Sequence, residues 1–154
     1  MWPEGSMELL RRWREHVWNG GRLDLIEAMV GPDWAAHVPG SPDFGTGPAG
    51  ARRYVAFYRG TFPDILFTCE DEVVQGGKVA TRWTARGTHR GPLMGIAPTG
   101  RASITKGMSI YRIREGKIQE EWSTWDTLGV LRQLGIIPLL PGEKGHDGPA
   151  SGGQ

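Results

Sequence analysis

The spacing of apolar residues changes near residue 65, and this change constrains the fold more than any other feature. Before it, apolar residues recur at helical spacing, which predicts helices over residues 7–18, 22–30 and 48–59. After it, apolar and polar residues alternate, which predicts strands. The expected strands begin at Ile65 and then occupy residues 78–89, 102–114 and 117–125. Helices followed by a run of strands indicate the α+β class.

Turn signals divide these strands into antiparallel hairpins. Gly76 and Gly77 form a two-residue hairpin signal, and a Glu-Gly pair at 115–116 separates the last two strands. The apolar segment 33–38 is a further strand candidate, and residues 127–134 predict a short helix. We expect a curved antiparallel sheet that wraps about three helices into a cone with an interior pocket.

The length of the chain fits one domain. The sequence has 154 residues, close to the commonest domain size. We assign residues 1–138 to the cone domain. Residues 139–154 are rich in glycine and proline, and we expect them to form a disordered tail.

Charge and cysteine content exclude several classes of protein. The 18 Lys+Arg and 17 Asp+Glu residues give a net charge of +1, without the basic excess of a nucleic-acid binder. The single cysteine, Cys69, cannot form an internal disulfide, and no histidine pair has metal-ligand spacing. No apolar run reaches the ~18 residues of a membrane span, and residues 1–15 lack signal-peptide features. We expect a cytoplasmic protein without a metal or cofactor that binds neither membranes nor nucleic acid.

Four segments carry a resemblance to a known family. They are residues 87–91 (Gly-Thr-His-Arg-Gly), 95–101, 111–118 and 121–135, of which the last is the strongest. Together they resemble the cone-shaped α+β fold of the nuclear transport factor 2 superfamily. Within it, they resemble the SnoaL-like polyketide cyclases, also known as ester cyclases. The resemblance covers about residues 7–138.

The resemblance implies a reaction and a pair of catalytic positions. Known members close a polyketide ring by intramolecular aldol condensation, without metal or Schiff base. An aspartate on the last strand serves as acid and base, and a histidine on the preceding strand binds substrate. The matching positions in this chain are Ser123 and Ser109, so both groups are replaced by serine. The implied ligand is a small hydrophobic or polyketide-like carbonyl compound.

Asp126 and His37 are the remaining candidates for catalysis. Asp126 follows Trp122 and Trp125, and a carboxylate in a dry indole-lined pocket would have a raised pKa. The alternative is that Asp126 caps the helix predicted to follow it. His37 has a side chain suited to proton transfer near neutral pH, and the resemblance places its segment at the mouth of the cavity. The alternative for His37 is a hydrogen-bonded core histidine.

Eight further residues are expected to contact substrate. The aromatic ones would form core and pocket wall together, and His89 would also anchor the glycine-rich loop that follows its strand. Glu121 shares a face of its strand with Ser123, so it is either a buried acid or a solvated or interface glutamate. The set is Trp83, Tyr54, Tyr58, His89, Ser109, Glu121, Ser123 and Trp125.

Three functions remain open from the sequence. The first is a cofactor-free acid/base cyclase, and the second is a small-molecule binding protein on the same fold, which the two serines favour. The third is a related epoxide hydrolase or isomerase. We also expect a homodimer, because the strand faces opposite Ser109 and Ser123 would leave an apolar patch exposed in a monomer. That patch consists of Ile104, Met108, Ile110 and Trp122.

Overall fold

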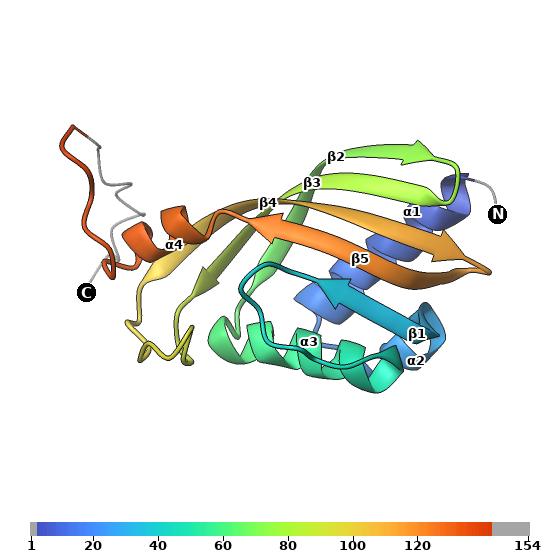
Figure 1. The fold of residues 1–154 in the computed structure, drawn as a ribbon, viewed down its shortest axis with the longest axis horizontal. Coiled ribbons are helices and arrows are strands. Elements are labelled where there is room, and N and C mark those ends of the chain that lie inside the picture. Colours follow the sequence, from blue (N-terminus) through green and yellow to red (C-terminus); the bar gives the residue numbers. More distant parts are fainter. Residues whose placement is uncertain (1–2, 143–154) are drawn as a thin grey trace.

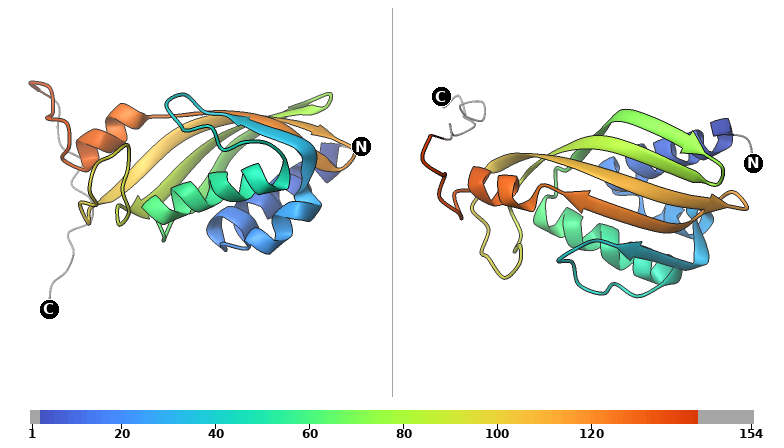
Figure 2. Two further views of the ribbon diagram at one scale, coloured as in Figure 1. Left: turned by 60° about the horizontal axis from the view of Figure 1, so that its bottom comes forward. Right: turned by 45° about the horizontal axis from the view of Figure 1, so that its top comes forward.

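Helices cover one face of a curved five-stranded sheet and leave much of its other face open (Figures 1 and 2). The computed structural model describes residues 3–142. The strands follow the order β1-β5-β4-β3-β2, and the sheet does not close into a barrel. They are β1 (Val30–His37), β2 (Leu66–Gln75), β3 (Lys78–Thr88), β4 (Ala102–Arg114) and β5 (Lys117–Trp125). The predicted α+β class is confirmed.

The described residues form four α-helices and two other helical turns. α3 starts where Gly47-Pro48 supplies the proline that suits a first helical position. None of the helices within residues 3–142 is long and apolar enough to cross a membrane. The elements are α1 (Pro3–Arg12), η1 (Trp13–Asn19), η2 (Leu23–Leu25), α2 (Ile26–Met29), α3 (Gly47–Thr61) and α4 (Thr127–Gln133). Residues 143–154, the greater part of the predicted tail, lie outside the described residues.

The N-terminal helices differ internally from the prediction. The first helix begins before residue 7, and at Trp13 it changes from an α-helix into the π-helical turn η1. The segment 22–30 divides into a 3₁₀ turn and the single-turn α2 before β1 begins at Val30. Helical periodicity does not reveal a π turn, because one wider turn shifts the apolar pattern only slightly. Such turns occur frequently at functional sites.

The sheet is mixed rather than fully antiparallel. β1 pairs in parallel with β5, and the remaining neighbouring strands pair antiparallel. The parallel pair is connected through α3 and the three intervening strands, so no hairpin signal in the sequence marks it. The segment 33–38 was therefore correctly predicted as extended, but its partner was not.

The inward face of the sheet is the one that carries Ser109 and Ser123. In the β4–β5 ladder, Ser109 lies opposite Ser123 and Tyr111 lies opposite Glu121. All four residues are buried, whereas Met108, on the other face, is exposed. The helices cover this inward face, which makes it the wall of the interior.

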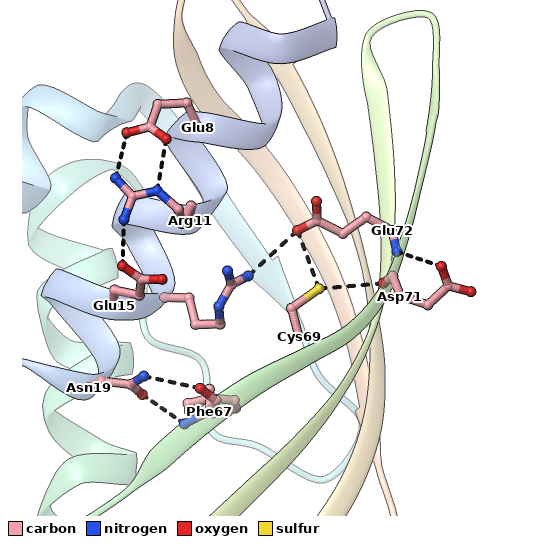
Figure 3. Close-up of polar contacts among 9 residues, drawn as sticks. Glu8, Arg11, Glu15, Asn19, Phe67, Cys69, Asp71 and Glu72 are labelled. Carbon is pink, nitrogen blue, oxygen red and sulfur yellow. Dashed lines mark hydrogen bonds and ion pairs between the residues drawn. The ribbon is translucent and has the colours of Figure 1, made fainter.

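The helical layer is tied to the sheet by the side chain of Asn19. Its Nδ2 donates to the carbonyl oxygen of Phe67 at 3.0 Å, and its Oδ1 accepts from the Phe67 N–H at 2.7 Å (Figure 3). An asparagine amide thus bonds both backbone groups of one β2 residue, as a neighbouring strand would. This contact fixes η1 over the edge of the sheet.

A break in alternation occurs within β2. The register between β2 and β3 shifts between Cys69 and Asp71, as at a β-bulge. Phe67 and Cys69 are partly buried before the shift, and Glu72 is partly buried after it. Without the bulge, Cys69 and Glu72 would face opposite sides of the sheet, because successive side chains alternate.

Candidate functional site

A cavity lies between the inward face of the sheet and the covering helices. Its volume is about 90 Å³, measured as the space open to the centre of a water molecule. By this measure one ordered water needs ~10–15 Å³, so the cavity has room for several. Most of its wall is apolar, with a few polar groups, as in small-molecule sites. The apolar lining includes Leu10, Trp13, Trp18, Val38, Phe62, Ile65, Phe67 and Ala85.

Glu121 brings a carboxyl group to this cavity from β5. The residue is only 1% exposed. Burial raises the pKa of Glu121 from 4.5 to about 8, and the hydrogen bond from Ser123 offsets only part of the shift. The carboxyl group therefore titrates near neutral pH, where an acid/base catalyst is most effective.

A chain of hydrogen bonds leads from Trp83 to Glu121. The indole Nε1 of Trp83 donates to Ser109 Oγ at 2.9 Å, and the Ser109 and Ser123 hydroxyls lie 2.7 Å apart. Ser123 Oγ then donates to Glu121 Oε2 at 3.2 Å. Because an indole N–H can only donate, the bonds align in one direction when Glu121 is ionised, with Ser109 donating to Ser123. The chain holds Oε2 in place and stabilises its negative charge.

The other carboxyl oxygen of Glu121, Oε1, accepts no such hydrogen bond from the part of the chain that the structure describes. Oε1 is buried and has no hydrogen-bond partner among residues 3–142. Leaving a buried polar atom unpaired costs about 1–3 kcal/mol. Glu121 lines the cavity, and Oε1 is the carboxyl oxygen that keeps its full capacity to accept a hydrogen bond.

Gly107 makes the position of the Trp83 ring possible. It lies opposite Trp83 in the β3–β4 ladder. A Cβ atom at this position would come within 2.3 Å of Trp83 Cζ2 and 2.7 Å of the Thr124 carbonyl oxygen. The absence of a side chain at Gly107 therefore lets the indole lie across the sheet and reach Ser109.

Seven of the eight residues expected to contact substrate line the cavity, and His89 does not. They are Trp83, Tyr54, Tyr58, Ser109, Glu121, Ser123 and Trp125. His89 is fully buried and its ring lies beside that of Phe62, which belongs to a second apolar cluster. Its Nδ1 accepts from the Thr99 N–H at 3.1 Å, so it anchors the loop after β3 as expected.

Asp126 lies outside this cavity lining. It is exposed at the end of β5, and its Oδ1 accepts from the Gly129 N–H at 2.9 Å. This is the capping arrangement weighed as the alternative for this residue. The catalytic hypothesis for Asp126 assumed a dry pocket, and the structure places its carboxylate on the surface instead.

His37 also points away from the cavity. It lies near the end of β1, where the next residue, Val38, lines the cavity, but its own side chain is about half exposed. Its ring stacks on Trp122, and its Nε2 lies 2.6 Å from Glu120 Oε2. Alternation along β1 sends Trp34 inward and His37 outward. His37 is therefore not brought together with Asp126 or Glu121 at one site.

Sequence reasoning missed two charged residues of the lining, Arg14 and Arg86. Arg14 contributes to the cavity wall from η1. The apolar pattern of the first helix gave no direction for Arg14, because the π turn that carries this residue leaves no signal in apolar spacing. For Glu121, the alternation of side chains along its strand predicts the burial correctly once the face that the helices cover is known.

Comparisons with known proteins identify the family of this chain. A family model described as SnoaL-like polyketide cyclase matches residues 8–134. Nogalonic acid methyl ester cyclase of Streptomyces nogalater is 30% identical over 120 residues, 77% of this chain and 90% of that protein. Aklanonic acid methyl ester cyclase DnrD of Streptomyces peucetius is 28% identical over 134 residues, 84% of this chain and 90% of that protein.

A solved structure extends the likeness to three dimensions. TsrD from Streptomyces laurentii matches with a TM-score of 0.79 at 26% identity, over 89% of this chain and 99% of that one. The family model spans more than half of the sequence, so this chain belongs to the SnoaL-like polyketide cyclase family. The family resemblance and the cone fold expected from it are both confirmed.

The buried carboxyl group predicts a pH-dependent difference in stability. A group whose pKa is raised by folding stabilises the fold fully below its unfolded pKa, here 4.5, and loses that contribution as pH rises through about 8. Glutamine cannot ionise, so Glu121→Gln avoids this loss. In urea unfolding, we expect the variant to match wild type near pH 4 and to exceed it by at least ~1 kcal/mol at pH 9. Equal stability of the two proteins at pH 9 would contradict the raised pKa.

Substitutions of Asp126 separate its capping role from a catalytic one. Asparagine caps about as well as aspartate, so Asp126→Asn should retain both melting temperature and kcat. Asp126→Ala removes the cap and should cost about 1 kcal/mol of stability without a comparable loss of kcat. A tenfold or larger fall of kcat in Asp126→Asn, at unchanged melting temperature, would restore the catalytic hypothesis for this residue.

Proposed function

We propose that this protein is a cofactor-independent cyclase that closes a ring in a small polyketide ester, with Glu121 as its acid/base group. The observation that carries the proposal is a buried carboxyl group of raised pKa, with an unpaired Oε1, on a residue that lines an apolar cavity. Two curated relatives support the substrate class, since their names refer to methyl esters of nogalonic and aklanonic acid. We also propose that this protein acts in the cytoplasm.

The proposed reaction is an intramolecular aldol addition. Ionised Glu121 removes a proton from a C–H flanked by carbonyl groups, and the resulting enolate carbon attacks a ketone carbon of the same molecule. One C–C bond forms, the carbonyl π bond becomes an alkoxide, and the alkoxide takes the proton back from Glu121. No atom or electron is gained or lost, so the chemistry needs one acid/base group and a pocket that orients the chain.

The surroundings of Glu121 suit both stages of this reaction. The hydrogen-bond chain from Trp83 through Ser109 and Ser123 stabilises the Glu121 carboxylate before substrate binds. Burial and the nearby Glu121 raise the pKa of Tyr54, so its phenol stays protonated. A protonated phenol in the cavity wall can donate a hydrogen bond to the oxyanion that develops during the reaction.

The position of Glu121 also accounts for the serines at the expected catalytic positions. Ser123 stands where the resemblance implies the acid/base aspartate, and Glu121 lies two residues earlier on the same face of β5. The longer glutamate side chain brings a carboxyl group to the same serine-lined surface. This favours an enzyme over the non-catalytic binding protein that Ser109 and Ser123 suggested.

Glu121→Gln tests the proposal directly. With a polyketide methyl ester of the kind named for the relatives, we expect kcat to fall by about 100- to 10,000-fold, the usual contribution of general acid–base catalysis. In wild type, kcat should rise with pH through an apparent pKa near 8, because the ionised carboxyl group acts first as a base. Product formation can be followed by chromatography.

Glu120→Gln is the matched control. Glu120 is the preceding residue on the opposite face of β5, where it pairs with His37 and Arg112. We expect it to retain near wild-type kcat. A large loss in Glu120→Gln with none in Glu121→Gln would transfer the function to the outer face and His37. If neither variant changes the turnover of any polyketide ester, the binding-protein alternative is favoured.

We also propose a homodimer that forms through the outer face of the sheet. Met108 and Ile110 are 61% and 44% exposed there, next to the partly buried Trp122. Burying such side chains against a second copy is favourable by ~25 cal/mol per Å² of apolar surface.

Light scattering at micromolar concentration tests this association. Wild type should have the mass of a dimer, and Ile110→Glu should shift it to monomer, because the charge would be buried at the interface. Met7→Glu, at an exposed position of α1 on the helical side of the molecule, is the control and should remain dimeric. A monomeric wild type would contradict the proposal.

A further inference from the structure

Two backbone irregularities bring Arg14, Glu72 and Cys69 together beside the cavity. The π-helical turn η1 carries Arg14, and the bulge in β2 turns Glu72 to the same side of the sheet as Cys69. Arg14 and Cys69 both line the cavity. Figure 3 shows Cys69 and Glu72 side by side, facing the N-terminal helix. Bulges and π turns each recur where a side chain has to be aimed at a functional site.

Arg14 is only loosely held by its partner. Its Nη1 lies 3.5 Å from Glu72 Oε1, longer than the ~2.7–2.9 Å of a charge-assisted hydrogen bond. The same Oε1 accepts a contact from Cys69 Sγ at 3.3 Å. A guanidinium has five N–H donors, so one long contact leaves most of its capacity for a ligand.

The partial burial of Arg14 and Glu72 strengthens the electrostatic interactions of the Arg14 guanidinium. The side chains of Arg14 and Glu72 are 20% and 13% exposed. By contrast, Arg11, one turn earlier, is about twice as exposed and makes two short bonds with Glu8 (Figure 3). A cation in a partly buried apolar setting interacts more strongly with an anion than one on the surface does.

Arg14 acts on the same environment as Glu121. Tyr111, which lies opposite Glu121 in the sheet, has a pKa raised chiefly by burial and by that carboxyl group, whereas Arg14 lowers it. The acid/base group and the guanidinium therefore both lie within electrostatic reach of one buried phenol in the cavity wall.

We propose that Arg14 binds an ionised oxygen of the substrate, a carboxylate or a phenolate, inside the cavity. This inference rests on the proposed function for the existence of a polyketide-like substrate, and it adds a charge requirement to it. Polyketides carry acidic phenol and enol oxygens, which a guanidinium recognises by paired hydrogen bonds and charge. Arg14 would fix one end of the chain while Glu121 acts on a carbon elsewhere in it.

The test is a binding experiment with two matched pairs of bicyclic probes. One pair is 2-naphthoate and its methyl ester, and the other is ionised 4-nitro-1-naphthol and its methyl ether. By calorimetry at pH 7.5, we expect wild type to bind at least one anion about tenfold more tightly than its neutral partner, because only the anion can form charge-assisted hydrogen bonds with the guanidinium. The pair that shows the preference identifies the oxygen as carboxylate or phenolate.

Variants decide whether Arg14 is responsible. Arg14→Gln should abolish the preference for the anion and leave the affinity for the neutral probe within about twofold. Glu72→Gln removes the competing carboxylate and should tighten anion binding several-fold, a result that a purely structural ion pair would not give. The controls Arg12→Gln, at the exposed end of α1, and Arg86→Gln, an exposed arginine at the cavity lining, should keep the preference.

The outcomes are independent of the test of Glu121. If wild type shows no preference for either anion, or if Arg86→Gln rather than Arg14→Gln abolishes it, the anion site is overturned, whatever the turnover of Glu121→Gln. If Arg14→Gln fails to fold, Glu72→Gln still decides, because unchanged or weaker anion binding there also overturns the proposal.

Discussion

The structure of the site depends on the burial of one ionisable carboxyl group, that of Glu121. Removing a carboxylate from water is unfavourable, so burial raises the pKa of Glu121 to about 8 and the group stays largely protonated below that pH. A single hydrogen bond from Ser123 offsets part of the cost of the ionised form. The covering helices, the aromatic wall and the curved sheet all contribute to that burial. The fold thereby accepts a loss of stability at higher pH and keeps a carboxyl group that titrates near neutral pH in an apolar cavity.

The precise placement of this group comes from strand pairing. Tyr111 and Ser109 on β4 face Glu121 and Ser123 on β5, and the next inward position of β4 is Gly107. The missing side chain there admits the indole of Trp83, which begins the hydrogen-bond chain to Glu121. The polar part of the site is therefore built on regular sheet, which holds side chains more rigidly than loops do.

The sequence predicted the strands more fully than the site. Alternation placed β3, β4 and β5 and grouped Glu121 with Ser123, because the period of a strand is a local property. It could not tell which face the helices cover, so Glu121 remained ambiguous and Asp126 was preferred. Arg14 was missed for a different reason, since its inward direction depends on a π turn that has no signature in apolar spacing.

The bulge in β2 has a second consequence, which concerns how copies of this protein avoid each other. β2 is an outer strand of the sheet, and a long flat outer strand invites another chain to extend the sheet. Here the bulge bends the strand, and the exposed Glu70 and Asp71 add negative charge to it. Growth of the sheet by strand addition at β2 is thereby disfavoured.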